Sequence, residues 1–273
     1  MAYSPVDLYR DVLPKTNCRD CGLLSCLAFA AKVVAEGLPL RECPHLDPDL
    51  VESIQQKLNA QYASGKWKKR DVAEDALIWA RQRAASLRIE DLEKRIEGRL
   101  VDREGQKVLE LPYFQDIIEI SRSGLKKRDD TKLTRLEQVF LYNHLAQGGS
   151  REPSGTWKGF QELPNTVSKV KSMREHVEKP LIERFSGDLK ALKTCGQSLG
   201  AIDTTEAFGS AEAALLFHPL PRVPVLLVFW DREEEFEAEV RLLFDETVTE
   251  HLDIESILFL SERLTELLCQ ESG

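Results

Sequence analysis

The chain has 273 residues, of which 42% are hydrophobic and 30% charged, so it holds enough apolar material for a core and is not globally disordered. This length is comfortable for two domains. The formal charge is −9, and residues 231–273 hold 14 acidic residues against three arginines. Because nucleic-acid binding depends on Lys and Arg that neutralise phosphates, we expect no nucleic-acid partner.

No targeting or membrane segment is predicted. The start, MAYSPVDLYRDVLPK, has no apolar run before a small-residue cleavage site, and no stretch approaches the roughly 18 apolar residues of a membrane span. We therefore expect a cytoplasmic protein without membrane insertion. In that compartment thiols stay reduced, and clustered cysteines bind metal or do redox chemistry more often than they form disulfides.

Short helices are expected on both sides of the first cysteines. A helix capped by Ser4 should run to Leu13, where Pro14 ends it. A second helix should run from about Ser25 to Glu36, because Gly37 stands in the usual C-terminal position.

Residues 47–65 and 71–87 predict two further amphipathic helices, the first of them ended by Gly65. The face of the second is expected to carry four residues at helical spacing: Val72, Ala76, Trp79 and Arg83. The basic run at 66–70 is interpreted as a solvated linker or a helix start.

A separate body is predicted from about residue 89. Strand-like runs flank the turn signal DREG within residues 95–111, and residues 116–121 continue the pattern. The pair Thr134 and Glu137 forms a capping box, which begins a helix that ends at Gly148.

A loop rich in Gly, Pro and Ser follows at 148–166 and carries Trp157 and Phe160. We expect these rings to pin the loop to the body; the alternative is that they line a site. Helical patterns fill 167–199, with an interruption near Pro180.

The last part of the chain predicts strands and a helix. Residues 223–230 form a continuous apolar run that is typical of a buried strand. The alternating residues of a half-buried neighbouring strand are Phe236, Ala238, Val240 and Leu242. An amphipathic helix is expected over 254–268.

Four of the six cysteines lie together, at the spacing Cys18-x2-Cys21-x4-Cys26-x16-Cys43. A disulfide framework would need an oxidising compartment, and the sequence shows no targeting signal for one. Structural zinc sites usually have two pairs of ligands, each close together in the sequence. Here the last two cysteines, Cys26 and Cys43, are separated by sixteen residues and do not form such a pair. An iron–sulfur cubane is larger than one zinc ion, so a compact loop can bind several irons while a distant cysteine closes the far side. We favour the cubane, with zinc as the alternative.

Neighbouring residues agree with this interpretation. Cys26 would lie in the first turn of a helix, whose positive end suits an anionic cluster, and Gly22 would let backbone amides approach the sulfurs. His45 is expected in a solvent-facing loop, and the alternative is a hydrogen bond that affects the cluster. Cys195 and Cys269 are interpreted as small hydrophobic residues.

The segment LPKTNCRDCGLLSCLAFAAKVVAEG, followed by CP, resembles the iron–sulfur domain of the large subunit of the corrinoid iron–sulfur protein of the acetyl-CoA pathway. It is similar also to the cluster domain in the B subunit of Rnf-type electron-transfer complexes. The resemblance covers about residues 13–46 and implies a [4Fe-4S] cluster held by Cys18, Cys21, Cys26 and Cys43.

Residues from about 89 to 270, with GTWKGFQELP, FHPLPRVPVLLVFW and LLFD, resemble a domain family of unknown function. Such domains are often joined to a cluster module in anaerobic bacteria and archaea. The resemblance implies an anaerobic setting and a pairing of modules, and it names no activity.

We therefore expect an α+β protein in three parts. These are a small helical iron–sulfur cluster domain (1–48), a helical linker (49–88) and a larger mixed α+β domain with a mainly antiparallel sheet (89–273). Four cysteines can ligate every iron of a cubane, which favours one-electron transfer over cluster chemistry on a substrate. An electron carrier or reductive activator is expected, rather than a stand-alone enzyme.

Two classes of partner are open. In the first, the larger domain engages a redox protein, a methyltransferase, a flavin or a tetrapyrrole such as corrinoid or haem. A tetrapyrrole would need an axial ligand, for which His144 and His218 are candidates because they lie in or beside apolar runs, with an ordinary core or loop histidine as the alternative. In the second, the protein is a non-enzymatic binding module with a structural or redox-sensing cluster. No catalytic residues are predicted, since phosphate loops, nucleophile elbows and HExxH patterns are missing.

Overall fold

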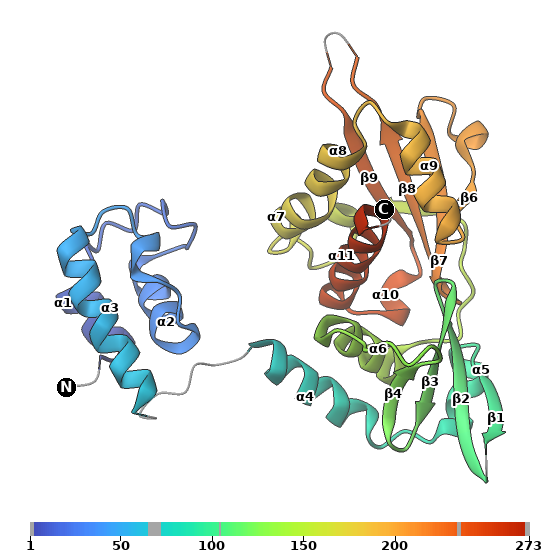
Figure 1. Cartoon of the computed structure of the whole chain (residues 1–273), viewed down its shortest axis with the longest axis horizontal. Helices are drawn as coiled ribbons and strands as arrows, with labels where there is room; N and C mark the ends of the chain where they lie inside the picture. The colour runs from blue at the N-terminus through green and yellow to red at the C-terminus, as the bar shows by residue number, and fades with distance from the viewer. Residues whose placement is uncertain (1–2, 65–71, 104, 234–235, 271–273) are drawn as a thin grey trace. The chain divides into compact units, whose positions relative to one another are not determined.

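In the computed structural model, the described residues are 3–64, 72–103, 105–233 and 236–270. The chain divides into two compact units, Met1–Ala76 and Leu77–Gly273 (Figure 1). The basic run at 66–70 and the helix end at Gly65 lie outside the described residues. The division into 1–48, 49–88 and 89–273 stays a prediction.

The described part of the first unit is helical. Its elements are α1 (Pro5–Asp11), α2 (Cys26–Glu36), a 3-10 turn (Leu40–Glu42) and α3 (Pro48–Ala63). The predicted Ser4 cap and the helix end at Gly37 are confirmed: Ser4 accepts a hydrogen bond at the start of α1, and Gly37 ends α2 with a left-handed backbone. Ser25, expected at about the start of the second helix, is the residue that caps α2.

A small apolar core holds these helices together. Leu8 of α1, Phe29 of α2 and Leu58 of α3 are fully or almost fully buried in it. Cys26 and Cys43 belong to the same core. The packing of three helices therefore fixes the positions of two of the four clustered cysteines.

Helix α4 (Val72–Ala84) buries a different face from the predicted one. Leu77 and Ala80 are buried, whereas Trp79 is 55% exposed. The guanidinium of Arg83 lies 4.6 Å from the centre of the Trp79 ring. The expectation that Trp79 belongs to the apolar face was wrong, because the 3.6-residue period also fits the stripe through Leu77 and Ala80.

The second unit contains a four-stranded antiparallel sheet whose strands follow chain order. They are β1 (Arg99–Arg103), β2 (Gln106–Tyr113), β3 (Asp116–Ser121) and β4 (Gly124–Lys127). The predicted runs around DREG and at 116–121 are confirmed. Strand β4 and helix α5 (Ile89–Arg95) were not predicted.

A second antiparallel sheet has the order β5-β9-β8-β7-β6. Its strands are β5 (Trp157–Gly159), β6 (Ile202–Asp203), β7 (Ala213–Leu220), β8 (Val223–Trp230) and β9 (Glu239–Asp245). Strand β8 is almost entirely buried, as predicted, and Val240 and Leu242 point into the core from β9. Phe236 is 70% exposed, so its assignment to a half-buried strand was wrong. It exchanges backbone hydrogen bonds with Glu233 and lies before β9 begins.

Further helices complete the second unit. Besides α4 and α5 they are α6 (Arg135–Gln147), α7 (Val170–Met173), α8 (Lys179–Phe185), α9 (Leu189–Ser198), α10 (Val248–His251) and α11 (Ile254–Gln270). A π-helical segment, Arg174–Glu178, joins α7 directly to α8. The interruption expected near Pro180 takes the form of a change from π- to α-helical geometry between Glu178 and Lys179, and Pro180, which has no N–H to donate, follows as the second residue of α8. No helix among the described residues is both long and apolar enough to cross a membrane.

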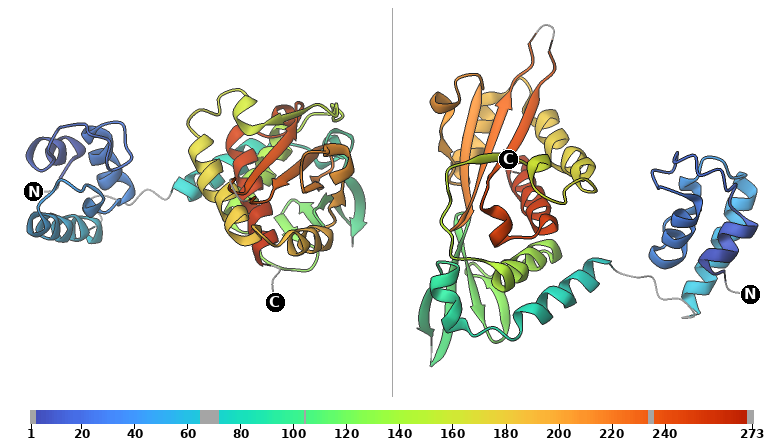
Figure 2. Two further views of the ribbon diagram at one scale, coloured as in Figure 1. Left: turned by 90° about the horizontal axis from the view of Figure 1, so that it is seen from above. Right: turned by 180° about the vertical axis from the view of Figure 1, so that it is seen from behind.

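One large core unites the two sheets with these helices. Figures 1 and 2 show α11 lying along the face of the five-stranded sheet. Phe160 is buried, with its ring centre 6.3 Å from that of Phe244, and Trp157 pairs with Asp245 in the sheet. The aromatic residues of the long loop thus pin it to the body, and the fold is α+β with antiparallel sheets, as expected.

Candidate iron–sulfur centre

The loop before α2 holds Cys18 and Cys21 on an unusual backbone. Lys15, Asn17 and Arg19 have φ values of 61°, 50° and 70°, and Gly22 follows at 76°. Nothing lies within 4 Å of the position that a Cβ of Gly22 would take, so the left-handed backbone alone makes glycine favourable there. Turns that contain left-handed residues can direct successive N–H groups into a concavity that binds anions.

Helix α2 presents Cys26 as its first residue. The N–H of Cys26 donates to Asn17 Oδ1 at 2.9 Å, and the N–H of Ala28 donates to Ser25 Oγ at 3.1 Å. The first bond fastens the cysteine loop to the helix start. Cys26 lies at the positive end of α2, as predicted, although these two amides already donate to protein oxygens.

Cys43 approaches the other three thiols from the segment after α2. Burial raises the pKa of the Cys43 thiol, and the backbone N–H of His45, which donates to this sulfur, opposes the increase. The nearby thiols of Cys21, Cys26 and Cys18 raise the pKa of Cys43 further. The other three thiols are therefore near enough to Cys43 for their charges to act on it. Among the described residues, the ligand atoms that all lie within 4.8 Å of one another belong to Cys18, Asp20 and His45, and not to a set of several cysteines.

The four thiols differ in their access to solvent. Cys26 and Cys43 are each 7% exposed, Cys21 is half-buried and Cys18 is exposed. All four are free thiols. A metal centre held here would have one side against the apolar core and one side, at Cys18, facing solvent.

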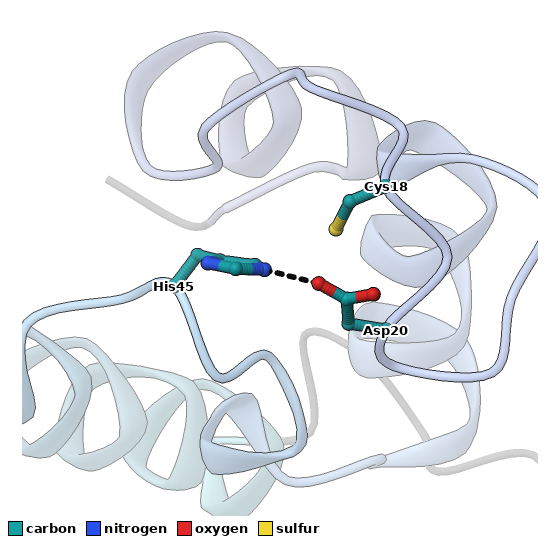
Figure 3. A group of neighbouring side chains, drawn as sticks. All are labelled: Cys18, Asp20 and His45. Carbon is teal, nitrogen blue, oxygen red and sulfur yellow. Dashed lines mark hydrogen bonds and ion pairs between the residues drawn. The ribbon is translucent and has the colours of Figure 1, made fainter.

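Two polar side chains lie beside Cys18 (Figure 3). His45 Nε2 is 2.5 Å from Asp20 Oδ2, and ligand atoms of Cys18, Asp20 and His45 all lie within 4.8 Å of one another. Hydrogen bonds from His45 and then from Cys18 lower the pKa of Asp20. His45 is thus solvent-facing and also near a cysteine of the group. Sequence reasoning missed Asp20, although its position two residues after Cys18 was a usable signal.

The donor set suits a thiophilic metal centre. Thiolates are preferred ligands of iron–sulfur clusters and of zinc. The left-handed loop, the helix start and the low exposure of Cys26 and Cys43 form a partly desolvated, anion-compatible environment. Asp20 and His45 add oxygen and nitrogen donors at the rim.

The structure places the two candidate axial histidines in different surroundings. His144, on α6, is 1% exposed, and burial lowers its pKa to about 4. Its Nδ1 lies 3.2 Å from the carbonyl oxygen of His251, while Nε2 has no hydrogen-bond partner among the described residues. His218 is exposed on β7. The imidazole next to His144 is that of His251, at 6.4 Å between ring centres, and sequence reasoning did not single it out.

The remaining cysteines belong to the larger unit. Cys195 is 5% exposed in the main core, and Cys269 on α11 is half-buried against it. Burial raises the pKa of the Cys269 thiol. Both behave as small hydrophobic residues, as predicted.

Together these features define an α+β protein whose N-terminal helical unit carries a segment with four clustered cysteines. Residues 13–45 match the family described as "Putative Fe-S cluster". Residues 88–267 match the family described as "Domain of unknown function (DUF3786)", and the chain belongs to this family. The expected pairing of an iron–sulfur segment with a domain of unknown function is confirmed.

Curated relatives share a short segment with the chain. The acetyl-CoA decarbonylase/synthase complex subunit gamma of Methanothermobacter thermautotrophicus is 40% identical over 58 residues, which is 21% of this chain and 12% of that subunit. The subunit of the same name from Methanocaldococcus jannaschii is 40% identical over 55 residues, or 20% and 11% of the two chains. The chain thus covers only a small part of these relatives. No solved structure matches it significantly, and the resemblance to the Rnf subunit stays an expectation.

Proposed function

We propose that this protein is a one-electron carrier that holds a [4Fe-4S] cluster on Cys18, Cys21, Cys26 and Cys43. The observation that supports this most is the match of residues 13–45, which contain all four of these cysteines, to an iron–sulfur family. When bound, the cluster would accept one electron from a donor and pass it to an acceptor. Four cysteine ligands leave no open iron position for a substrate, which favours electron transfer.

The surrounding residues have separate tasks in this proposal. Cys26 and Cys43 anchor the centre to the apolar core, and the start of α2 stabilises its negative charge. Asn17 holds the loop against the helix through the Cys26 N–H. Cys18 lies on the exposed side, which makes that side the route for electrons.

We propose further that residues 89–273 engage the electron partner. The candidates are a redox protein, a methyltransferase, a flavin or a tetrapyrrole such as corrinoid or haem. The relatives are named as subunits of a complex, which supports a protein partner. For a tetrapyrrole, His144 and His218 are the proposed axial ligands, since His144 is neutral with a free Nε2 among the described residues and His218 is accessible. The proposed setting is the cytoplasm of an anaerobe, without nucleic-acid binding or membrane insertion.

A second candidate function is redox or oxygen sensing by the same centre. The exposure of Cys18 supports it, because an exposed ligand gives oxidants access to the centre. In that case the cluster would be lost or converted on oxidation, and it would not cycle between two redox states.

The metal content of the full chain, purified anaerobically, tests the cluster assignment. We expect about four irons and four sulfides per chain. Cys21→Ala should remove most of both, whereas Cys195→Ala, which changes a buried cysteine outside the group, should leave them unchanged. About one zinc per chain without sulfide, or equal losses in both variants, would contradict the assignment.

A further inference from the structure

The larger unit contains a pocket that the cluster does not explain. It measures about 700 Å³ and is lined by residues of α4, α5 and α6 and of the hairpin formed by β3 and β4. This volume is within the usual range of small-molecule sites, about 300–1,000 Å³. All the residues that line it belong to the second unit.

The floor of the pocket is apolar. Leu87, Ile89, Leu125 and Tyr142 line it and are partly buried hydrophobic residues that pack against the main core. The core holds these side chains in place, so the surface is largely formed before a ligand arrives. A flat ring system could cover this floor and remove its apolar area from water.

The rim of the pocket is cationic. It carries Arg81 and Arg122 and no Asp or Glu, in a chain of net charge −9. Arg81 donates to Gln138 Oε1 at 2.7 Å, and its guanidinium lies 5.8 Å from the centre of the Tyr142 ring. Arg122 has neither an ion pair nor a hydrogen bond from its side chain among the described residues. One arginine is therefore held in position while the other is free to bind an anion.

The hairpin turn adds hydroxyl groups to this rim. Ser121 and Ser123 line the pocket, with 2.7 Å between their Oγ atoms. Gly124 closes the turn at φ 125°, and a Cβ there would lie 3.3 Å from the Tyr142 hydroxyl. Glycine thus lets the hairpin that carries Ser121, Arg122 and Ser123 lie close to Tyr142.

An adjoining hollow extends the cationic surface. It shares Leu87, Ile89, Arg122 and Ser123 with the first pocket and adds Arg88 and Lys107. Its acidic residue, Glu90, pairs with Lys107 at 2.9 Å, so these two charges offset each other and Arg88 is the positive charge that the hollow adds. A ligand with an extended phosphate-bearing tail therefore meets positive charge beyond the first pocket as well.

We propose that this pocket binds a phosphate-bearing heteroaromatic cofactor of the flavin-nucleotide class. Arg122 and Arg81 hold the phosphate, and the ring system lies on the apolar floor. The physiological role of this site rests on the electron-transfer function proposed above, because it names the class of the electron partner. Binding itself is independent of the cluster and can be measured separately.

Binding of FMN to the full chain tests the proposal, followed by fluorescence quenching, with riboflavin as the probe that lacks the phosphate. Arg122→Gln should weaken FMN binding at least tenfold, or about 1.4 kcal/mol. Arg99→Gln is the matched control, since Arg99 is an exposed arginine on β1 outside both hollows, and it should bind FMN like the unaltered chain. Riboflavin should bind at least tenfold more weakly than FMN.

A space-filling variant tests access to the pocket without removing a charge. Ala85→Trp places a large ring at the rim of the pocket and should weaken FMN binding, whereas Ser86→Trp changes an exposed neighbour that lines neither hollow and should not. Equal binding by Arg122→Gln and Arg99→Gln, or no saturation by FMN up to about 1 mM, would overturn the proposal. Iron and sulfide measured in the same samples separate the FMN proposal from the electron-carrier proposal. An intact cluster without FMN binding would contradict only the FMN proposal. FMN binding without a cluster would contradict only the electron-carrier proposal.

Discussion

At the residue scale, the fold has a clear effect on the protonation of His144. Burial lowers its pKa to about 4 from an ordinary value of 6.5. The carbonyl oxygen of His251 opposes the shift, whereas His251, Arg95 and Arg222 would repel a proton on the ring. The unfolded chain therefore takes up this proton at a higher pH than the folded chain does.

The stability contribution of neutral His144 should be complete above about pH 6.5 and should fall as the pH drops toward 4. When the pH is lowered from 7 to 5, we expect His144 to lower the free energy of unfolding by about 2 kcal/mol. Urea unfolding at the two pH values measures this cost. His144→Gln should lose that part of the pH dependence, while His176→Gln, at an exposed histidine, should keep it. Equal pH dependence in both variants would contradict the assignment.

Gly22 gives a second prediction at this scale. Its φ of 76° costs a residue with a side chain about 1–2 kcal/mol, although space around it is open. Gly22→Ala should therefore increase the rate at which a chelator removes iron from the anaerobic protein. Gly209→Ala, at a glycine with φ −41° and open space, should not. The idea fails if the two variants lose iron at the same rate.

At the scale of elements, Glu137 connects α6 to three other parts of the larger unit. Its buried carboxylate accepts hydrogen bonds from the Tyr113 hydroxyl on β2 at 2.9 Å and from Arg263 Nε on α11 at 3.1 Å, and Lys127 Nζ on β4 lies 3.2 Å away. Burial raises the pKa of Glu137, but the Thr134 amide, Arg263 and Lys127 hold it below its ordinary value. The carboxylate is therefore charged and fully paired at neutral pH.

Removing this charge leaves two cations facing a neutral group. Glu137→Gln should lower the free energy of unfolding by about 3 kcal/mol, as expected when one partner of a buried ion pair is lost. Glu183→Gln, which changes an exposed glutamate on α8, should alter it by less than about 0.5 kcal/mol. Denaturant unfolding of the full chain measures both variants, and similar values for the two would show that the network is not stabilising.

The same scale shows which elements could be predicted. Helices α1 and α6 were predicted because Ser4 and Thr134 form caps within a few residues of chain, and α2 was predicted because Gly37 ends it. Strands β4, β5 and β6 are short and exist through pairing with a neighbour, which local sequence does not reveal. Trp79 and Phe236 were expected to be at least half-buried, and both are exposed. Periodicity shows which residues share a face of a helix or strand, but not which of these faces another element covers.

At the scale of the whole molecule, the two units differ in how far the sequence describes them. The four clustered cysteines lie within 26 residues of one another, so a metal site could be predicted from their spacing, with the cluster ligands implied by the family resemblance. Asp20 and His45 meet only through the fold of two loops, and the pocket around Arg122 is assembled from three helices and a hairpin. Those features depend on tertiary packing, which composition and spacing do not contain.

The central claim is that the four cysteines hold a cluster that transfers one electron. A redox titration of the anaerobic full chain, followed by electron paramagnetic resonance and quantified against iron, tests it most directly. We expect a paramagnetic signal that appears and disappears reversibly with about one electron per four irons. This signal should be missing in Cys21→Ala. A chain that contains zinc without sulfide, or a cluster that is destroyed when it is reduced, would contradict the claim.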